Sequence, residues 1–249
     1  MDKDLEAKLK YLRLTELLES WDELMAQAKE KGPTYPAFTK QMIDLEITAK
    51  RERARQQRLR RSKPEEMYLI ETYPFDRQPG VPKKKIIELF DSMNYLRKKQ
   101  NVIFVGPTGV GKTGLATALM IHAINSGASG RFITFPALLD ELYRSVADHS
   151  EKKVLKKFLS YEVLVVDELG YLEIDPQQAG LFFTLMKQRH KKATTIVTTQ
   201  LGFKEWAGFL KNPHLTLALI DRLTENSQLI NMGKCQSLRD NRSTDSKSP

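Results

Sequence analysis

Short apolar runs alternate with longer helical segments over most of the chain beyond residue 100. The runs lie at 101–105, about 131–135, 163–167, about 194–199 and about 228–232. Strands that alternate with helices in this way are typical of a parallel sheet with helices on both faces. The pattern therefore predicts an α/β fold built on a parallel five-stranded sheet.

A purely helical pattern fills the N-terminal part of the chain. Apolar residues recur at helical intervals between Leu5 and Met25, and Gly32 followed by Pro33 ends the pattern. A second helical pattern begins at Phe38 and continues into an arginine-rich run. We expect two amphipathic helices that form a small all-α unit ahead of the sheet.

A proline-rich stretch separates the two patterns, between residues 64 and 82. Such a stretch interrupts regular structure, so we expect a domain boundary there. The expected organisation is a helical N-terminal domain over 1–64 and an α/β domain over 65–240. The polar residues 241–249 are expected to form a disordered tail.

A glycine-rich run joins the first predicted strand to the helix after it. Its glycines permit backbone angles at which successive N–H groups turn toward a phosphate at a helix N-terminus. Lys112 is placed to neutralise β- and γ-phosphate oxygens, and the Thr113 hydroxyl to ligate Mg²⁺. A glycine turn without a ligand is the alternative, but the order strand, loop, helix favours a nucleoside triphosphate site. The candidate phosphate-binding residues are Gly106, Pro107, Thr108, Gly109, Val110, Gly111, Lys112, Thr113 and Gly114.

The third predicted strand ends in an acidic pair, Asp167 and Glu168. Open α/β sheets bind their ligands at the carboxyl ends of their strands. Asp167 is therefore a second candidate ligand for Mg²⁺, and Glu168 is suited to orient and deprotonate a water molecule. A solvated acidic turn is the alternative interpretation, and the glycine-rich run favours the hydrolytic one.

Two later polar residues are further candidates. Gln200 ends the fourth predicted strand, where its amide could contact the terminal phosphate or merely cap the strand. Arg222 lies among leucines near the end of a predicted helix. It could stabilise transition-state charge at the nucleotide of a neighbouring subunit, or form a surface pair with Asp221.

Composition and cysteine content limit the classes of protein to which the chain could belong. Of 249 residues, 41% are hydrophobic and 29% charged, and no apolar run reaches membrane-spanning length. Cys235 is the single cysteine, and four histidines show no metal-ligand spacing. The charged N-terminus lacks a signal-peptide core. We expect a cytoplasmic protein without membrane contact.

The formal net charge of +9 suggests a polyanionic partner. Basic residues concentrate between residues 50 and 63, where helical spacing puts Arg51, Arg55 and Arg58 on one face. A phosphate backbone fits such a helix, and a solvated linker helix is the alternative. The candidate DNA-binding residues are Lys50, Arg51, Arg53, Arg55, Arg58, Arg60 and Arg61.

Taken in order, these features resemble the IstB/DnaC branch of AAA+ ATPases, and most closely the IstB-like insertion-sequence ATP-binding proteins. The similarity covers nearly the whole chain. Its more specific parts are the segments 165–171, 203–206 and 221–223. The resemblance implies an AAA+ type P-loop NTPase that binds ATP with Mg²⁺, forms homo-oligomers with shared nucleotide sites, binds duplex DNA and assists a transposase.

Carried over residue by residue, Lys112 and Thr113 match the phosphate and magnesium positions of this family. Asp167 and Glu168 match its acidic pair, and Arg222 matches its trans-acting arginine. The chain departs from the pattern in two places. Gln200 replaces the usual asparagine, and Arg239 meets the second nucleotide-sensing position only with stretched spacing.

The expected function is thus an ATP-dependent DNA-binding helper of transposition. A helicase loader would share the same ATPase core and grip a replicative helicase with its N-terminal helices. A non-hydrolysing DNA-binding protein with a nucleotide switch is the alternative of another class. A small-molecule kinase is disfavoured, because Glu168 is suited to activate water and no acceptor pocket is evident.

Overall fold

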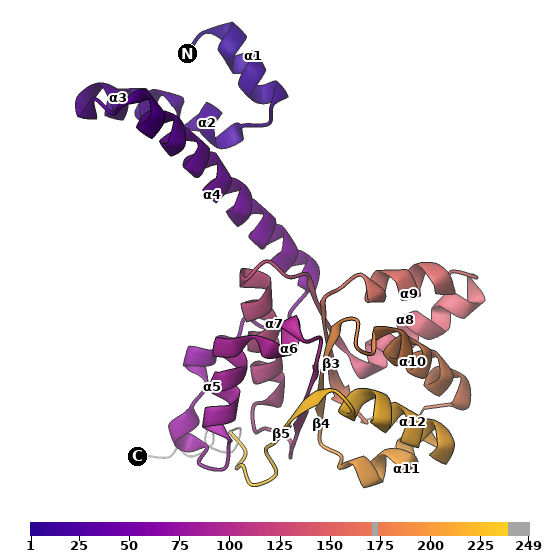
Figure 1. Ribbon diagram of the computed structural model, residues 1–249. Coiled ribbons are helices and arrows are strands. Elements are labelled where there is room, and N and C mark those ends of the chain that lie inside the picture. Colours follow the sequence, from indigo (N-terminus) through magenta and orange to yellow (C-terminus); the bar gives the residue numbers. More distant parts are fainter. Residues whose placement is uncertain (171–173, 239–249) are drawn as a thin grey trace, which may run out of the picture. The chain divides into compact units, whose positions relative to one another are not determined.

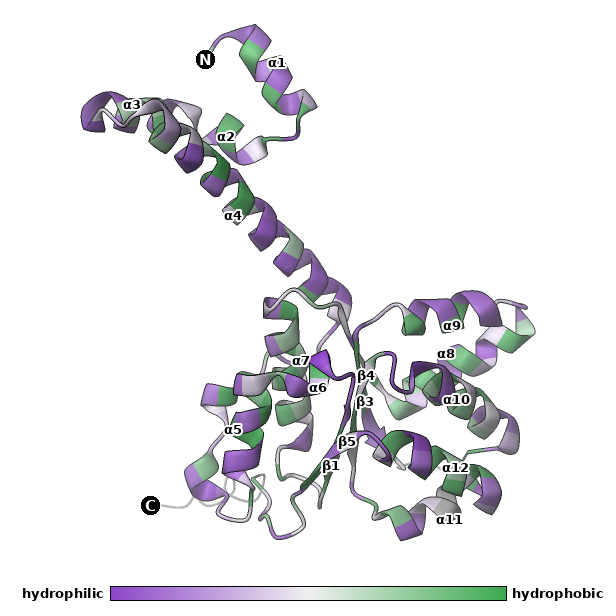
Figure 2. Cartoon of the chain, viewed as in Figure 1, coloured by the Kyte–Doolittle hydropathy of each residue, from purple (hydrophilic) through white to green (hydrophobic). Residues whose placement is uncertain are grey.

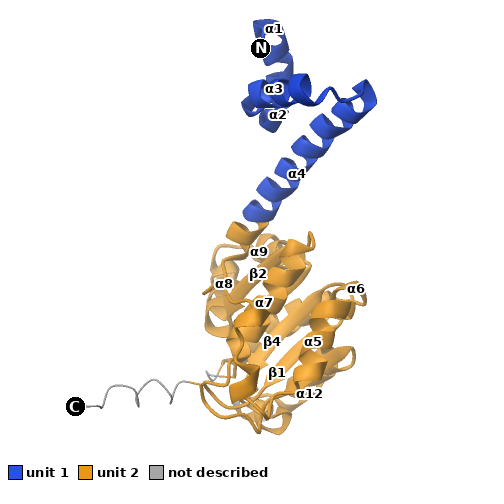
Figure 3. Cartoon of the chain, turned by 90° about the vertical axis from the view of Figure 1, so that its left-hand side faces the viewer, with its two compact units in different colours: residues 1–57 blue, residues 58–249 orange. Residues whose placement is uncertain are grey.

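The computed structural model describes residues 1–170 and 174–238. They form two compact units, Met1–Gln57 and a second unit that begins at Arg58 (Figure 3). The predicted tail at 241–249 and the candidate Arg239 lie outside the described residues.

The first unit is entirely helical. It consists of α1 (Lys3–Tyr11), α2 (Thr15–Glu19), α3 (Trp21–Lys31) and most of α4 (Tyr35–Ser62), whose last residues belong to the second unit. Leu9, Leu17 and Leu24 are buried together and form its small core.

The prediction of a single helix between Leu5 and Met25 is wrong, because the chain turns twice within that segment. Arg13 adopts a left-handed conformation with φ of 55°, and the Leu14 N–H donates to the Leu9 carbonyl at 2.9 Å. This bond ends α1 in the manner of a helix C-cap. Ser20 then separates α2 from α3.

A five-stranded, fully parallel sheet forms the centre of the second unit, as predicted. Its order is β2-β3-β4-β1-β5. The strands are β1 (Asn101–Val105), β2 (Gly130–Thr134), β3 (Val163–Leu169), β4 (Thr194–Thr199) and β5 (Ser227–Asn231). The second strand ends one residue before its predicted end, because Phe135 begins the next helix.

Helices cover both faces of this sheet (Figure 1). The α-helices of the second unit are α5 (Lys83–Ser92), α6 (Asn94–Arg97), α7 (Lys112–Asn125), α8 (Phe135–Ala147), α9 (Glu151–Leu159), α10 (Pro176–Arg189), α11 (Trp206–Leu210) and α12 (Pro213–Thr224). Three short 3-10 helices complete the described elements, η1 (Ile70–Thr72), η2 (Phe75–Arg77) and η3 (Phe203–Glu205). Among the described helices, none combines the length and the hydrophobicity that a membrane span requires.

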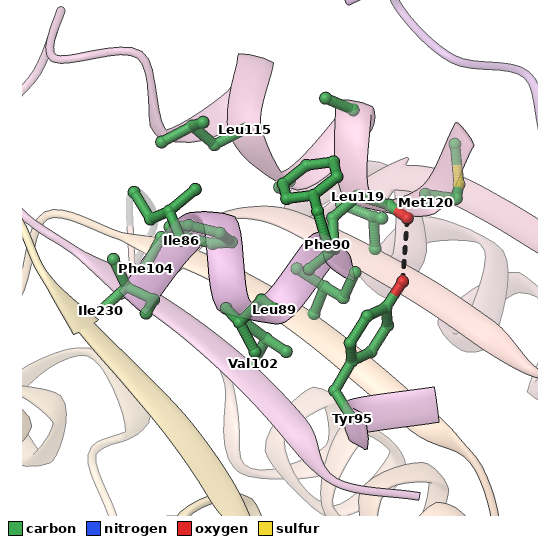
Figure 4. Close-up of a cluster of buried hydrophobic side chains, with 14 of the residues drawn as sticks. Ile86, Leu89, Phe90, Tyr95, Val102, Phe104, Leu115, Leu119, Met120 and Ile230 are labelled. Atoms are coloured by element: carbon green, nitrogen blue, oxygen red, sulfur yellow. Dashed lines mark hydrogen bonds between the residues drawn. The ribbon is translucent and has the colours of Figure 1, made fainter. Parts of the chain in front are cut away.

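Strands β1 to β4 alternate their side chains between two cores, whereas the edge strand β5 contributes only Ile230, to the first of them. Val102 and Phe104 of β1 join the core under α5 and α7, where the Tyr95 hydroxyl donates to the Leu119 carbonyl at 3.1 Å (Figure 4). Ile103 points to the opposite core, under α8, α10 and α12. Both faces are therefore apolar at the centre of the sheet, and the colouring by hydropathy shows green stretches in the strands and alternating green and purple along most of the helices (Figure 2).

The strand order decides where a ligand can bind. Because β4 lies between β3 and β1, the carboxyl ends of these three strands meet at one edge of the sheet. The loop after β1 and the acidic end of β3 are thereby brought together from positions about 60 residues apart in the sequence.

Candidate functional site

The glycine-rich loop leaves β1 at Val105 and leads directly into α7, which begins at Lys112. Gly109 and Gly111 have φ of 84° and 89°, in the left-handed region that favours glycine. A side chain at Gly111 would also place its Cβ 2.7 Å from Cε2 of Tyr73. Both the backbone angle and the close approach therefore require glycine at this position.

Lys112 is held over the loop that it terminates. Its Nζ donates to the carbonyl oxygens of Gly106 and Pro107, at 2.8 Å and 2.7 Å. The ammonium thus lies at the mouth of the loop, beside the first N–H groups of α7. A phosphate there would meet both the lysine charge and the positive end of the helix dipole.

Thr113 and Asp167 face each other across the sheet edge. The Thr113 hydroxyl is 3.1 Å from each carboxylate oxygen of Asp167, and the Thr198 hydroxyl of β4 also donates to this carboxylate. Asp167 is only 2% exposed, and this burial raises the pKa of its carboxyl, against the lowering effect of the Thr198 and Thr113 hydrogen bonds and the Lys112 charge. Oxygen donors around a buried carboxylate fit Mg²⁺, whose charge would offset the cost of burial.

Glu168 is exposed, although it lies within β3. The pairing of β3 with β4 shifts register between Val166 and Leu169, and Glu168 has φ of 62°. Its N–H donates to the Thr198 hydroxyl at 3.0 Å. This bulge turns the Glu168 side chain out of the sheet and toward the cavity beside the loop.

That cavity has a volume of about 640 Å³, within the range of small-molecule sites. Its polar end is formed by the loop, the acidic strand and the end of β4. The residues at this end are Thr108, Gly109, Gly111, Lys112, Thr113, Gly114, Glu168, Thr198, Thr199 and Gln200. Among the other predicted loop residues, Gly106 packs against Met232, Pro107 lends a carbonyl to Lys112, and Val110 is buried.

The apolar end of the cavity was not predicted from the sequence. It is formed by the segment before α5 and by a residue near the C-terminus: Tyr68, Leu69, Tyr73, Pro74 and Leu238, with Glu66 and Thr72 of the same segment as its polar members. The Tyr73 hydroxyl donates to the Val110 carbonyl at 2.8 Å, and burial raises its pKa so that it remains a donor. The signal available in the sequence was the presence of two tyrosines in a stretch that otherwise looks like a linker.

Gln200 lies at the cavity, where its Oε1 accepts a hydrogen bond from the Thr108 hydroxyl at 3.1 Å. This bond links the end of β4 to the phosphate loop. Although glutamine is longer than the asparagine usual in the family, the Gln200 side chain lies at the predicted nucleotide site.

Arg222 does not lie at this cavity. Its carbonyl accepts from the side chain of Asn101, the first residue of β1, so the length of β1 separates it from the loop, about 15 Å at the rise of a strand. Its guanidinium pairs with Asp221 at 2.9 Å and lies 3.8 Å from Glu225. The surface pair weighed from the sequence is thus present, and Arg222 cannot reach the phosphates of its own chain.

The basic residues of α4 fall into two groups. Lys50 and Arg53 pair with Glu46, and Arg55 pairs with Glu52, whose pKa is lowered to about 2 by hydrogen bonds from Arg55 and Gln56. By contrast, Arg51, Arg60 and Arg61 are exposed and form no ion pair with described residues, and Arg58 is partly buried.

Loop, acidic strand end and cavity meet at one edge of a parallel sheet, which is the arrangement of the P-loop class of nucleotide-binding proteins. The model of the IstB-like ATP binding protein family matches residues 7–246. The chain therefore belongs to the IstB-like ATP-binding proteins, as its sequence motifs indicated.

Individual relatives agree with this membership. The chain is 32% identical over 232 residues to the "Insertion sequence IS5376 putative ATP-binding protein" of Geobacillus stearothermophilus, covering 93% of this chain and 92% of the relative. It is 30% identical over 240 residues to the "Insertion sequence IS21 putative ATP-binding protein" of Pseudomonas aeruginosa, covering 96% and 90%.

Solved structures also resemble part of this chain. The DnaC helicase loader has a TM-score of 0.52 and 25% identity, covering 59% of this chain and 86% of that one. DnaI has a TM-score of 0.53 and 20% identity, covering 60% and 84%. The predicted AAA+ type of P-loop fold is confirmed by these neighbours.

Proposed function

We propose that this protein is a Mg²⁺-dependent ATPase that binds duplex DNA and assists the transposase of an insertion sequence. The observation that carries the proposal is the convergence of Lys112, the Thr113–Asp167 pair and Glu168 on one cavity. Membership of the IstB-like family and relatives named for insertion sequences support ATP as the nucleotide and transposition as the setting.

Each side chain then has a defined task toward bound ATP. The loop N–H groups and Lys112 bind the phosphates, and the apolar end of the cavity receives the base. Thr113 and Asp167 would hold Mg²⁺, which supplies charge neutralisation at the phosphate oxygens when bound. Glu168 orients and deprotonates the attacking water, and Gln200 contacts the terminal phosphate.

Arg222 acts, in this proposal, on the nucleotide of a neighbouring copy. Because Arg222 lies far from the cavity of its own chain, it could contact a nucleotide phosphate only in the cavity of a neighbouring copy. The proposal therefore includes a homo-oligomer with the nucleotide shared between copies. Arg222 would have to exchange its Asp221 pair for that contact.

DNA binding is assigned to the basic part of α4. Arg51, Arg60 and Arg61 are the strongest candidates, since they are exposed and their charge is not neutralised by described neighbours. Lys50, Arg53, Arg55 and Arg58 would contribute to the surrounding positive field. Contacts of this kind read phosphate rather than sequence, so little site preference is expected. A helper that acts on target DNA is also expected to work in the cytoplasm.

The test is DNA affinity with and without ATP. Wild-type protein should bind duplex DNA more tightly with ATP and Mg²⁺, and the affinity should fall steeply as salt rises. Lys112→Ala should lose the ATP response, while the exposed control Lys152→Ala should keep it. Equal DNA affinity of Lys112→Ala and wild type under ATP would contradict the coupling.

The likeness to the DnaC helicase loader favours helicase loading as a second candidate function. That likeness covers 59% of the chain, so it does not extend to the whole protein. Capture by a transposase or by a hexameric helicase in a pull-down separates the two candidates. Release of phosphate by the purified protein separates both from a static nucleotide switch.

A further inference from the structure

The chain returns from β5 to the phosphate loop in a short segment, Met232–Leu238, which we call the strap. At its start, the Met232 N–H donates to the carbonyl of Val105 at 2.7 Å. At its end, the Leu238 N–H donates to the carbonyl of Gly109 at 2.9 Å, and Leu238 lines the cavity. The strap thus touches the loop directly and supplies part of the apolar wall.

A buried glutamine joins this strap to the segment before α5, which lines the same cavity. Gln78 is 1% exposed and lies just after η2. Its Nε2 donates to the Gln236 carbonyl, and its Oε1 accepts from the Gln236 N–H at 3.1 Å. The side-chain amide thereby occupies both backbone groups of one strap residue, as a neighbouring strand would.

The surrounding backbone is shaped for this contact. A Cβ on Gly80 would lie 2.5 Å from the Lys234 carbonyl oxygen, so the two segments approach too closely for any other residue there. Cys235 of the strap is buried in the core under α5 and α7. The Gln236 side chain is exposed, so only its backbone takes part.

The segment before α5, the strap and the phosphate loop are therefore joined pairwise by hydrogen bonds. Tyr73 bonds the segment before α5 to Val110 of the loop, and Leu238 bonds the strap to Gly109 of the loop. Gln78 joins the segment before α5 to the strap. Loss of the Gln78 side-chain amide would remove both hydrogen bonds to the Gln236 backbone and would free the strap to leave the loop.

We propose that Gln78 is a positioning residue of the nucleotide site: it holds the strap, and with it Leu238, against the end of the cavity that receives the base. This inference rests on the proposed binding of ATP. Because Leu238 would contact the base equally in the ground state and the transition state, releasing it weakens nucleotide binding and leaves the chemical step unchanged. By linkage, bound nucleotide should in turn stabilise the strap.

The experiment uses the full-length chain and the variants Gln78→Glu and Gln78→Ala. Gln78→Glu keeps the shape and the acceptor but places a carboxylate oxygen against the Gln236 carbonyl. Amide hydrogen exchange at Gln236 and Leu238 should speed up at least about tenfold in nucleotide-free protein. The Kd for ADP, measured by calorimetry, should rise about tenfold, while kcat at saturating ATP stays within about twofold of wild type.

Gln236→Ala is the matched control, since it keeps the backbone groups that Gln78 binds and should show wild-type exchange and affinity. Gln78→Glu with wild-type strap exchange, or with wild-type ADP affinity, would overturn the inference. Should Gln78→Ala fail to fold, Gln78→Glu supplies the same readouts. A wild-type protein that bound no nucleotide would instead contradict the proposed function, so the two failures are distinguishable.

Discussion

Glu168 shows how one residue of the site is held in a costly conformation. Its positive φ of 62° costs a residue with a side chain on the order of 1–3 kcal/mol. The hydrogen bond from its N–H to Thr198 holds the bulge in place. What this geometry achieves is an exposed carboxylate beside the phosphate loop, directly next to the buried Asp167.

Replacing Glu168 with glutamine tests its role as the base. Glu168→Gln keeps the size and the backbone but cannot accept the water proton, so hydrolysis should fall about 10²- to 10⁴-fold. The Kd for ATP should stay close to that of wild type. Steady-state phosphate release measures the rate of hydrolysis, and calorimetry measures the Kd for ATP. The exposed Glu71→Gln should retain wild-type activity, and a fully active Glu168→Gln would show that another group activates the water.

Burial of the Asp167 carboxylate lowers the stability of the nucleotide-free protein by an amount that depends on pH. Burial raises its pKa above the ordinary value of 3.8, so the folded protein holds this proton more tightly than the unfolded chain does. The stability that goes with the protonated form is therefore lost as pH rises through the raised pKa. Asp167→Asn should be more stable than nucleotide-free wild type at pH 7, and the gap should narrow as pH falls toward 4.

Denaturant unfolding at several pH values measures that gap, with the exposed Asp91→Asn as control. The same Asp167→Asn variant should lose the Mg²⁺ dependence of ATP binding, because its amide is a weaker ligand. A gap that does not change with pH would show that burial of the Asp167 charge is not what destabilises the apo protein.

At the scale of elements, the sequence predicted what depends on local pattern. The strands were recognisable because both faces of a parallel sheet are apolar, and the loop because Gly109, Gly111 and Lys112 have few other uses in this order. The breaks at Arg13 and Ser20 were missed, because helical periodicity continues across a turn when the short helices pack on a shared leucine core.

The walls of the cavity were missed for a different reason. Tyr73 and Leu238 are separated by more than 160 residues, and their meeting depends on the path of the strap back from β5. Long-range contacts of this kind leave no periodic signal. Likewise, the sequence offered seven candidate DNA-binding residues on α4 but did not show that three of them pair with Glu46 or Glu52.

Glu46 yields a prediction for the helical unit. Its carboxylate is 3% exposed and accepts hydrogen bonds from the N–H groups of Glu16 and Leu17, at 2.9 Å and 3.1 Å, and from Arg53. Glu46→Ala should destabilise this unit by about 1–3 kcal/mol, because buried donors lose their acceptor. Thermal unfolding followed by circular dichroism measures the loss. The exposed Glu23→Ala is the control, and equal stability of both variants would contradict a structural role for Glu46.

At the scale of the whole molecule, the proposed role of Arg222 in trans predicts that activity depends on a second copy. Arg222→Ala should bind ATP normally and hydrolyse it about 10³-fold more slowly. Mixing it with Lys112→Ala should raise the rate at least about tenfold above that of either variant, because the second chain supplies the missing arginine to an intact cavity.

The double variant Lys112→Ala/Arg222→Ala is the control for this mixing experiment, since it has no arginine to donate. Rescue by the double variant, or no rescue by Lys112→Ala, would remove Arg222 from the shared site. The Asp221–Arg222 pair would then be a surface pair of small energetic weight.

The proposed roles of the loop, the acidic pair and Arg222 all depend on ATP occupying the cavity between the phosphate loop and Tyr73. Calorimetric titration of the folded full-length protein with ATP and Mg²⁺ tests this directly. The account predicts saturable binding of one nucleotide per chain, lost in Lys112→Ala, which keeps the fold but removes the charge at the loop. Absence of ATP binding to properly folded wild-type protein, or equal affinity of Lys112→Ala, would contradict it.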